Sequence, residues 1–254
     1  MNEFGCIAVE IVTGETRQAF RIVPMDTNGD GVGDIWFEDL DGDGLNDLME
    51  PLGAIGSWAT AVDDTGRAYA TYLDTSGFVV LPDGTLSMTD SSLDQMTIYG
   101  GNRGGLAVGY YNTGKSIRNS AGVLSKMRAP CLIQGLDTDG DGDPDQWYRD
   151  ANGDGKNDLM VKLGMLSGYT DFCWANAVND SGTIVGIGQN TRGASAYRAL
   201  IWKNQVAVDL NTLVAPSGVV LEEAVAINQD GVIFCTGKDA TGAMHECLLM
   251  PIAP

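Results

Sequence analysis

The fold is decided by a short repeat, seen in AVNDSGTIVGIG (177–188), in AINQDGVIFCTG (226–237) and in AVDDTGRAYATY (61–72). Each copy has two apolar residues, a polar turn rich in Asp or Asn that ends in glycine, and then a strand of alternating apolar residues. Alternation with a period of two, bounded by turn residues, is typical of antiparallel β-sheet. Looser copies at 2–12 and 101–111 bring the number of predicted units to about five.

A second apolar strand follows each copy of the repeat, and some units have a further short strand, such as LMEPLG or VAVDL. The second strands lie at 18–23, 77–82, 129–134, 198–203 and 245–250. Such a unit cannot bury its sheet faces alone, so the units must stack. We therefore predict a single all-β domain over residues 1–254, a β-propeller-like array of about five antiparallel units. A β-sandwich or an open β-solenoid is the alternative arrangement.

Composition limits the classes of partner. The chain has 34 glycines among its 254 residues and 44% hydrophobic residues, which indicates a globular protein with many turns. A net charge of −19 without a basic cluster disfavours nucleic-acid binding. No apolar run approaches the roughly 18 residues that span a membrane. The opening MNEFGCIAVE lacks the basic and apolar parts of a signal peptide, so secretion would need a leader outside these residues.

Two segments are near-copies of each other. DTNGDGVGDIWFEDLDGDGLNDLMEPLG (26–53) aligns without a gap with DTDGDGDPDQWYRDANGDGKNDLMVKLG (137–164), and together they hold half of the 34 Asp and Glu residues. Like charges packed this closely repel unless cations neutralise them. We therefore interpret residues 26–50 and 137–161 as cation-binding insertions in the repeat domain.

Each insertion contains the spacing D-x-[DN]-x-[DN]-G-x-x-D twice. Calcium takes about six to eight oxygen ligands, and carboxylates at alternate positions of a tight loop converge on one point. The seventh residue would offer its backbone carbonyl, and the ninth-position Asp would complete the shell. About four Ca²⁺ ions are thus predicted, with the ligands Asp26, Asn28, Asp30, Val32 and Asp34; Asp39, Asp41, Asp43, Leu45 and Asp47; Asp137, Asp139, Asp141, Asp143 and Asp145; and Asp150, Asn152, Asp154, Lys156 and Asp158.

These loops differ from an EF-hand, which has a bidentate Glu at position 12 between two helices. That position holds Phe37, Glu50, Tyr148 and Val161. The loops resemble those of integrin-type propellers and thrombospondin type 3 repeats, in which the ninth Asp is a ligand. Between the two loops of each insertion we expect a four-residue strand whose tryptophan, Trp36 or Trp147, anchors the insertion on its unit. Metal-free Asx turns are the alternative for a single loop, and four recurrences disfavour it.

The repeat also resembles a known family. AVNDSGTIVGIGQN (177–190), YRALIWKNQVAVDLN (197–211) and LEEAVAINQDGVIFCTGKDATGAMHECLLMP (221–251) are similar to the HAF-type extracellular repeats of bacteria, which have an A-x-A-I-N-x-x-G-x-I-V-G core followed by A-F-L-W and D-L-G. The resemblance covers most of the chain and departs from the pattern at residues 68–70, at 233–235 and in both insertions. It implies a propeller-like protein that is secreted or attached to the cell envelope. Calcium affinities of about 0.1–1 mM also suit an extracellular site.

Catalysis has little support. His245 is the only histidine, and no G-x-S-x-G motif supplies a nucleophile. A polysaccharide-active enzyme on a propeller scaffold is the alternative that would need only carboxylates. Its candidates are Asp63, Asp64, Asp180, Glu222, Glu223 and Asp230. A calcium-dependent self-assembling structural protein is the other alternative. We expect a non-catalytic module for an unidentified protein or glycan ligand, with possible self-association.

The five cysteines contain no C-x-x-C pair, which excludes a zinc ribbon or a thioredoxin motif. Cys235 and Cys247 lie on consecutive predicted strands, where an antiparallel register can place them opposite each other. They are the predicted pair for any disulfide, and two small core residues are the alternative. We expect Cys6, Cys131 and Cys173 to be buried thiols.

Overall fold

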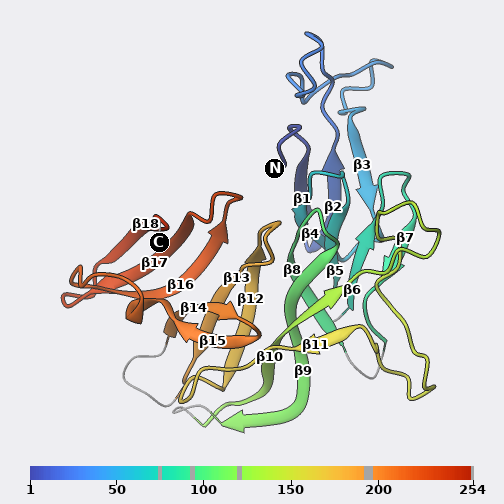
Figure 1. The fold of residues 1–254 in the computed structure, drawn as a ribbon. Helices are drawn as coiled ribbons and strands as arrows, with labels where there is room; N and C mark the ends of the chain where they lie inside the picture. Colours follow the sequence, from blue (N-terminus) through green and yellow to red (C-terminus); the bar gives the residue numbers. More distant parts are fainter. Residues whose placement is uncertain (74–75, 92–94, 119–121, 192–196, 253–254) are drawn as a thin grey trace. The chain divides into compact units, whose positions relative to one another are not determined.

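In a computed structural model about half of the chain forms β-strands, which pair mainly as antiparallel sheets (Figure 1). The structure describes residues 1–73, 76–91, 95–118, 122–191 and 197–252. Among these residues there is no α-helix, only the 3₁₀ helix η1 (Leu210–Thr212), and no described sheet closes into a barrel. The all-β prediction is confirmed. The chain divides into two compact units, residues 1–105 with 135–159, and residues 106–134 with 160–254.

The first unit contains two antiparallel sheets. The first sheet consists of β1 (Ile7–Thr13), β2 (Thr16–Ile22) and β3 (Met49–Leu52), and the second sheet of β4 (Ser57–Val62), β5 (Ala68–Tyr72), β6 (Ser76–Val80) and β7 (Leu86–Met88). Strand β8 (Met96–Gly101) also belongs to this unit. The two sheets pack face to face through a core of Ala19, Leu52, Ala68, Ala70, Phe78 and Val80. The small alanines allow this close approach.

The second unit has a long sheet and a last sheet. The long sheet runs in the order β15 (Val206–Asp209), β14 (Tyr197–Lys203), β13 (Ile184–Gln189), β12 (Phe172–Val178), β10 (Leu124–Gln134), β9 (Leu106–Arg118), with β11 (Met160–Lys162) also paired to β10. The last sheet consists of β16 (Val219–Ile227), β17 (Ile233–Asp239) and β18 (Met244–Leu249). Val185 and Ile201 of the long sheet pack against Ile233 and Cys235 of the last sheet.

In each unit, the polar turn of one repeat also links two neighbouring sheets. Asn2 Nδ2 donates to the carbonyl of Asp63 at 2.8 Å in the first unit. Asn179 Nδ2 donates in the same way to the carbonyl of Asn228 at 3.1 Å in the second. The asparagine that opens the turn therefore holds the next turn along the chain, which is a role that the repeat alone does not reveal.

The predicted strands around the two insertion tryptophans are wrong. Only the isolated bridges Met25–Ile35 and Leu136–Gln146 form there. The reason lies in Asn46, whose side chain takes the backbone groups that a strand partner would use. Its Nδ2 donates to the carbonyl of Trp36 at 2.8 Å, and its Oδ1 accepts from the amide of Glu38 at 3.2 Å.

The register of the last sheet places Cys235 directly opposite Cys247, as the sequence predicts, and both thiols are free. Burial raises the pKa of Cys235, and likewise that of Cys173, to about 12. Four of the five cysteines are buried, and Cys247 is half-buried.

We therefore expect native protein at about pH 8 to react with a thiol reagent at one cysteine, Cys247, because this thiol is half-buried whereas the other four are buried. Intact-mass and peptide-mass measurement would show one fast adduct, with the others appearing only after denaturation. A Cys247→Ser variant should show no fast adduct. Rapid modification of two or more cysteines in the folded protein would contradict this expectation.

Candidate metal centre

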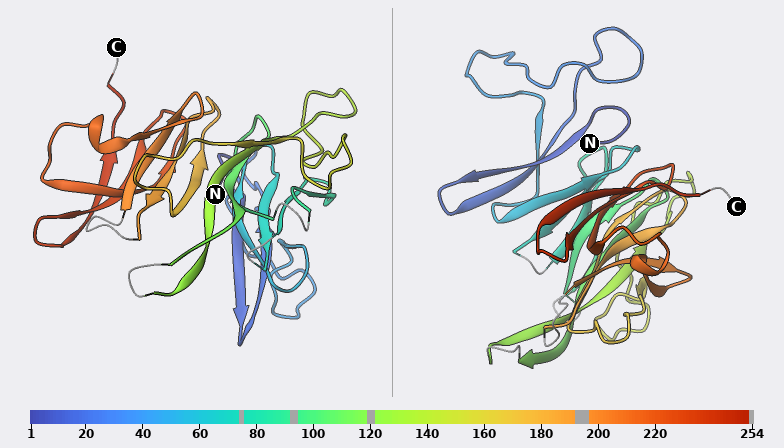
Figure 2. Two further views of the ribbon diagram at one scale, coloured as in Figure 1. Left: turned by 90° about the horizontal axis from the view of Figure 1, so that it is seen from below. Right: turned by 90° about the vertical axis from the view of Figure 1, so that its left-hand side faces the viewer.

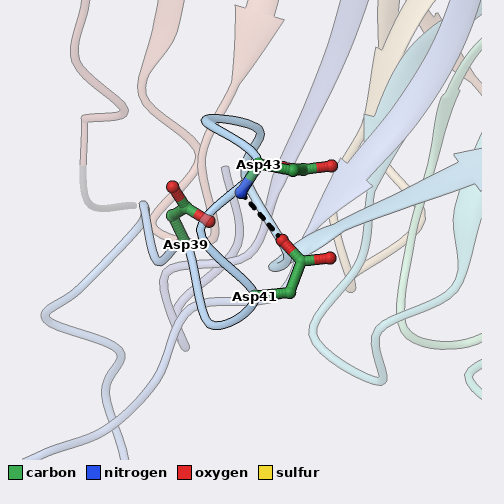
Figure 3. A group of neighbouring side chains, drawn as sticks. All are labelled: Asp39, Asp41 and Asp43. Carbon is green, nitrogen blue, oxygen red and sulfur yellow. Dashed lines mark hydrogen bonds between the residues drawn. The ribbon is translucent and has the colours of Figure 1, made fainter.

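The second loop shows how the backbone shapes each aspartate turn (Figure 3). Asp39 accepts hydrogen bonds from the amides of Gly42 at 2.6 Å and Gly44 at 2.9 Å. Asp41 accepts from the amide of Asp43 at 3.1 Å, and Asp43 in turn from the amide of Leu45 at 2.8 Å. Each carboxylate thus fixes the backbone two to five residues ahead, so the loop curls around its own acidic side chains.

The same bonds recur in the other three loops, which is the strongest evidence that the four sequences build one structure. The first-position acceptors are Asp26, Asp137 and Asp150; the third-position acceptors are Asn28, Asp139 and Asn152; and the fifth-position acceptors are Asp30, Asp141 and Asp154. The glycines at the fourth and sixth positions of the second loop, Gly42 and Gly44, have φ values of 81° and 84°. Residues with a Cβ rarely adopt this conformation, which explains the glycines in the motif.

Two of the loops bring three carboxylates together. In one, ligand oxygens of Asp39, Asp41 and Asp43 all lie within 4.8 Å of one another, and in the other those of Asp137, Asp139 and Asp141 do so. Such groups can hold a metal ion. The first and fourth loops have an asparagine, Asn28 or Asn152, at the third position, so an amide oxygen replaces one carboxylate there.

The ninth-position aspartates close the loops. Asp34 accepts from the side-chain hydroxyl of Thr27 at 2.8 Å, and Asp47 from the amide of Leu40 at 2.6 Å. Asp145 and Asp158 make the corresponding bonds to the second residue of their loops. The assignment of these four as ligands stays a prediction, as does that of the carbonyls of Val32, Leu45, Asp143 and Lys156.

Backbone amides also set the ionisation of the loops. The amides of Gly31 and then Gly29 lower the pKa of Asp26, and those of Gly140 and then Gly142 lower the pKa of Asp137. Hydrogen bonds of this kind favour the charged carboxylate. Asp26 and Asp137 are therefore ionised at neutral pH, which is the form that binds a cation.

The second insertion is fixed to the second sheet through Trp147. The indole is fully buried, and its Nε1 donates to the carbonyl of Gly105 at 2.9 Å. Its backbone amide donates to Ser87 Oγ at 3.0 Å, and the guanidinium of Arg67 lies 5.7 Å from the ring centroid. The indole thus has a hydrogen bond, a cation–π contact and full burial in one place.

Asn157 and Ser91 complete this attachment. Asn157 Nδ2 donates to the carbonyls of Trp147 and Thr89, both at 2.7 Å, and Ser91 Oγ donates to the carbonyl of Gly155 in the fourth loop. The predicted tryptophan anchor is confirmed for this insertion.

The first insertion has the same internal hydrogen bonds, but its tryptophan is less buried than that of the second. Trp36 Nε1 donates to the carbonyl of Gly5 at 2.7 Å, as Trp147 does to Gly105. However, Trp36 is 37% exposed, and the neighbouring Phe37 is 60% exposed. Figures 1 and 2 show residues 26–47 extending beyond β2 and β3 as an open double loop.

A buried polar cluster beside the second insertion is absent from the sequence-based predictions. Asp63 accepts from Arg67 Nε and from the hydroxyl of Tyr69, both at 2.9 Å, and all three residues are at most 5% exposed. Arg67 also donates to the carbonyl of Arg103. The only sequence signal for this cluster is Arg67 itself, which follows the turn glycine in the copy at 61–72. The copies at 177–188 and 226–237 have the uncharged residues Thr183 and Val232 at this position.

The other carboxylates considered for catalysis have structural contacts or lie in turns. Glu222 pairs with Lys238 at 3.1 Å, and Glu223 accepts from Asn176 at 2.9 Å. Asp64 accepts from the amide of Glu3 at 2.8 Å. His245 pairs with Asp239 at 2.9 Å on its own hairpin. The expectation that the protein is not an enzyme stays a prediction.

Within the described part of the chain, no helix is long and apolar enough to cross a membrane. Comparison of the chain with models of protein families, with curated proteins and with solved structures found no match.

Proposed function

We propose that this protein is an extracellular, non-catalytic β-repeat module that binds about four Ca²⁺ ions. The observation that carries the proposal is the identical hydrogen-bond pattern of the four aspartate loops, two of which gather three carboxylates within 4.8 Å. Loops that merely turned the chain would not need an acid or amide at every alternate position.

Calcium fits these loops better than magnesium does. The donors are carboxylate, amide and carbonyl oxygens on a short flexible loop, and calcium accepts about six to eight such ligands in irregular geometry. Magnesium requires nearly octahedral geometry and retains several waters, so it is usually bound by only one or two carboxylates. Softer metals favour thiolate or imidazole ligands, and the loops have neither.

The resemblance to HAF-type repeats supports a propeller-like protein of the cell envelope or the extracellular space. Extracellular calcium is abundant enough to fill sites of about 0.1–1 mM affinity, whereas cytosolic calcium is not. In this proposal the ions stiffen the two insertions, and the protein binds a protein or glycan ligand through surfaces that the sheets support.

Calorimetric titration of the chelator-treated protein with calcium tests the proposal. We expect about four ions per chain, and about one fewer in the double variant Asp39→Asn with Asp43→Asn, because both positions hold Asp in all four loops and each Asn removes a negative charge and one carboxylate oxygen. Magnesium at the same concentration should compete only weakly.

Asp230→Asn is the matched control, because Asp230 is an exposed aspartate in a repeat turn outside both insertions. It should leave the stoichiometry unchanged. No calcium uptake at millimolar concentration, or equal loss in the control, would defeat the proposal.

A further inference from the structure

We propose that copies of this chain bind one another head to tail, with the last sheet (β16–β18) of one copy packed on the first sheet (β1–β3) of the next. The inference follows from the way neighbouring sheets pack inside each unit. It goes beyond the proposed calcium binding and does not depend on it.

Inside each unit, four equivalent positions of a sheet face the sheet that precedes it in the chain. In the second sheet they are Ala68, Ala70, Phe78 and Val80, which are at most 4% exposed. In the last sheet they are Ile233, Cys235, Cys247 and Leu249, which pack against the long sheet. These positions therefore mark the face with which a sheet docks on its predecessor.

The first sheet has the same face, which also consists of four apolar residues. Its equivalent residues are Ile7, Val9, Phe20 and Ile22, paired across β1 and β2 as Ile7–Ile22 and Val9–Phe20. Each of them is only half-buried, and Ile11, two residues beyond Val9, is 42% exposed. On the opposite face, Ala19 and Leu52 are 0% and 1% exposed. The first sheet thus presents a docking face that no described sheet covers.

The last sheet presents the complementary face. Tyr69 and Val79 of the second sheet point away from the first sheet and are 0% exposed. The equivalent residues of the long sheet, Val185 and Ile201, are 0% and 8% exposed. The equivalent pair in the last sheet is Phe234 with Leu248. Leu248 is 67% exposed, and Met244 on the same strand is 60% exposed.

The polar turns supply a second, independent argument. Where two sheets dock, two hydrogen bonds join the polar turn of one repeat to the polar turn of the next. The first turn residue, Asn2 or Asn179, donates its side-chain amide to a backbone carbonyl of the next turn. The residue after it donates its backbone amide to a side chain of the same next turn. Glu3 donates to Asp64 Oδ1, and Asp180 to Gln229 Oε1, both at 2.8 Å. This pair of bonds occurs in both units.

The first and last turns of the chain each hold a group that could form such a bond with another copy. Asn228 Nδ2 is the donor in the last turn, and the Glu3 carboxylate is the acceptor in the first. Among the described residues neither has a hydrogen-bond partner, and both residues are exposed. A docked copy would pair Asn228 with the carbonyl of Asn2, and the amide of Gln229 with Glu3.

The exposure of Trp36 also supports a second copy of the chain as the partner of the first sheet. Its counterpart Trp147 is covered by the sheet that precedes it, through Ser87 and Arg67. Trp36 is 37% exposed, and no described sheet covers it as the second sheet covers Trp147. A sheet docked on β1–β3 would lie where the second sheet lies for Trp147, and would cover the indole.

A head-to-tail contact between different faces leaves one free face at each end, so it continues into chains or closes into rings. We expect analytical ultracentrifugation of the full chain to give an average mass that rises with concentration above the monomer value of 26.9 kDa. The rise should occur with calcium and with chelator, which separates this result from failure of the proposed calcium binding.

Two variants each block one end. Leu248→Glu places a charge on the last sheet, and Val9→Glu places one on the first; each alone should remain at 26.9 kDa. An equimolar mixture of the two should form dimers and nothing larger, because only one compatible pair of faces remains. Leu124→Glu is the control, since Leu124 is 59% exposed but lies on neither face, and it should assemble like the wild type.

A wild-type protein that stays monomeric at every concentration would overturn the proposal, because the two faces would then be covered in another way or remain free. Assembly that survives either variant, or a mixture that stays monomeric, would also overturn it. Far-ultraviolet circular dichroism confirms that each variant is folded. If Val9→Glu is not, Ile11→Glu tests the same face at a more exposed position.

Discussion

Calcium removal is expected to lower the melting temperature of the first unit by about 10 °C, while that of the second unit stays the same. All four loops lie within residues 26–47 and 137–158, which belong to the first unit. One site stabilises the folded state by about 1.4 kcal/mol when calcium is ~10-fold above its Kd. Three or four sites would contribute about 4–6 kcal/mol, and each kcal/mol shifts the melting temperature of a domain of this size by roughly 2–4 °C.

Differential scanning calorimetry measures this directly, with scans in millimolar calcium, in chelator and in magnesium. The calcium-dependent transition should move, and a second transition should not. In the Asp39→Asn, Asp43→Asn variant the shift should shrink by about a quarter, and Asp230→Asn should leave it intact. Identical scans in calcium and chelator would contradict the expectation.

The second large effect concerns the two tryptophans of the duplicated insertions. Trp147→Ala should lower the free energy of unfolding by about 3–5 kcal/mol, because it empties a fully buried site and leaves Arg67 without its ring. Trp36→Ala removes the same side chain from nearly the same local sequence. It should cost well under half as much, because Trp36 is already 37% exposed.

Urea unfolding of both variants, at a protein concentration low enough to keep the chain monomeric, gives the comparison. The chemistry of the substitution is identical, so the difference reports only the cover that each indole receives. Equal losses for the two variants would show that the docking of the second insertion on the second sheet contributes little.

These tryptophans also show what the sequence could and could not predict. Alternation and turn residues predicted the strands of all five repeats, and the D-x-[DN]-x-[DN]-G-x-x-D spacing predicted loops that the structure folds alike. The burial of Trp147 was not predictable from its neighbours, since Trp36 has almost the same ones. It depends on Ser87 and Arg67, which come from a different repeat.

The expected strand around each tryptophan failed for a related reason. The residues around Trp36 and Trp147 have side chains that favour β-strands. However, the side chains of Asn46 and Asn157 form hydrogen bonds with the tryptophan carbonyls that a strand partner would otherwise use. Local propensity does not register a side chain ten residues away. The division into two units likewise depends on long-range packing, in which residues 135–159 leave the long sheet and join the first unit.

Residues 135–159 belong to the first unit although they follow residues 106–134 of the second, so the first unit can be completed during synthesis only after they emerge. A ribosome adds about 5–20 residues per second, so several seconds pass between the emergence of Gly105 and of the segment that carries Trp147 and Asn157. Throughout this interval the nascent chain has Arg67 and Thr89 in place without the indole and the amide that later contact them. The amino-terminal half must therefore wait for a piece of the carboxy-terminal half, and a fragment ending at residue 105 would expose that side of its second sheet to chaperones and proteases.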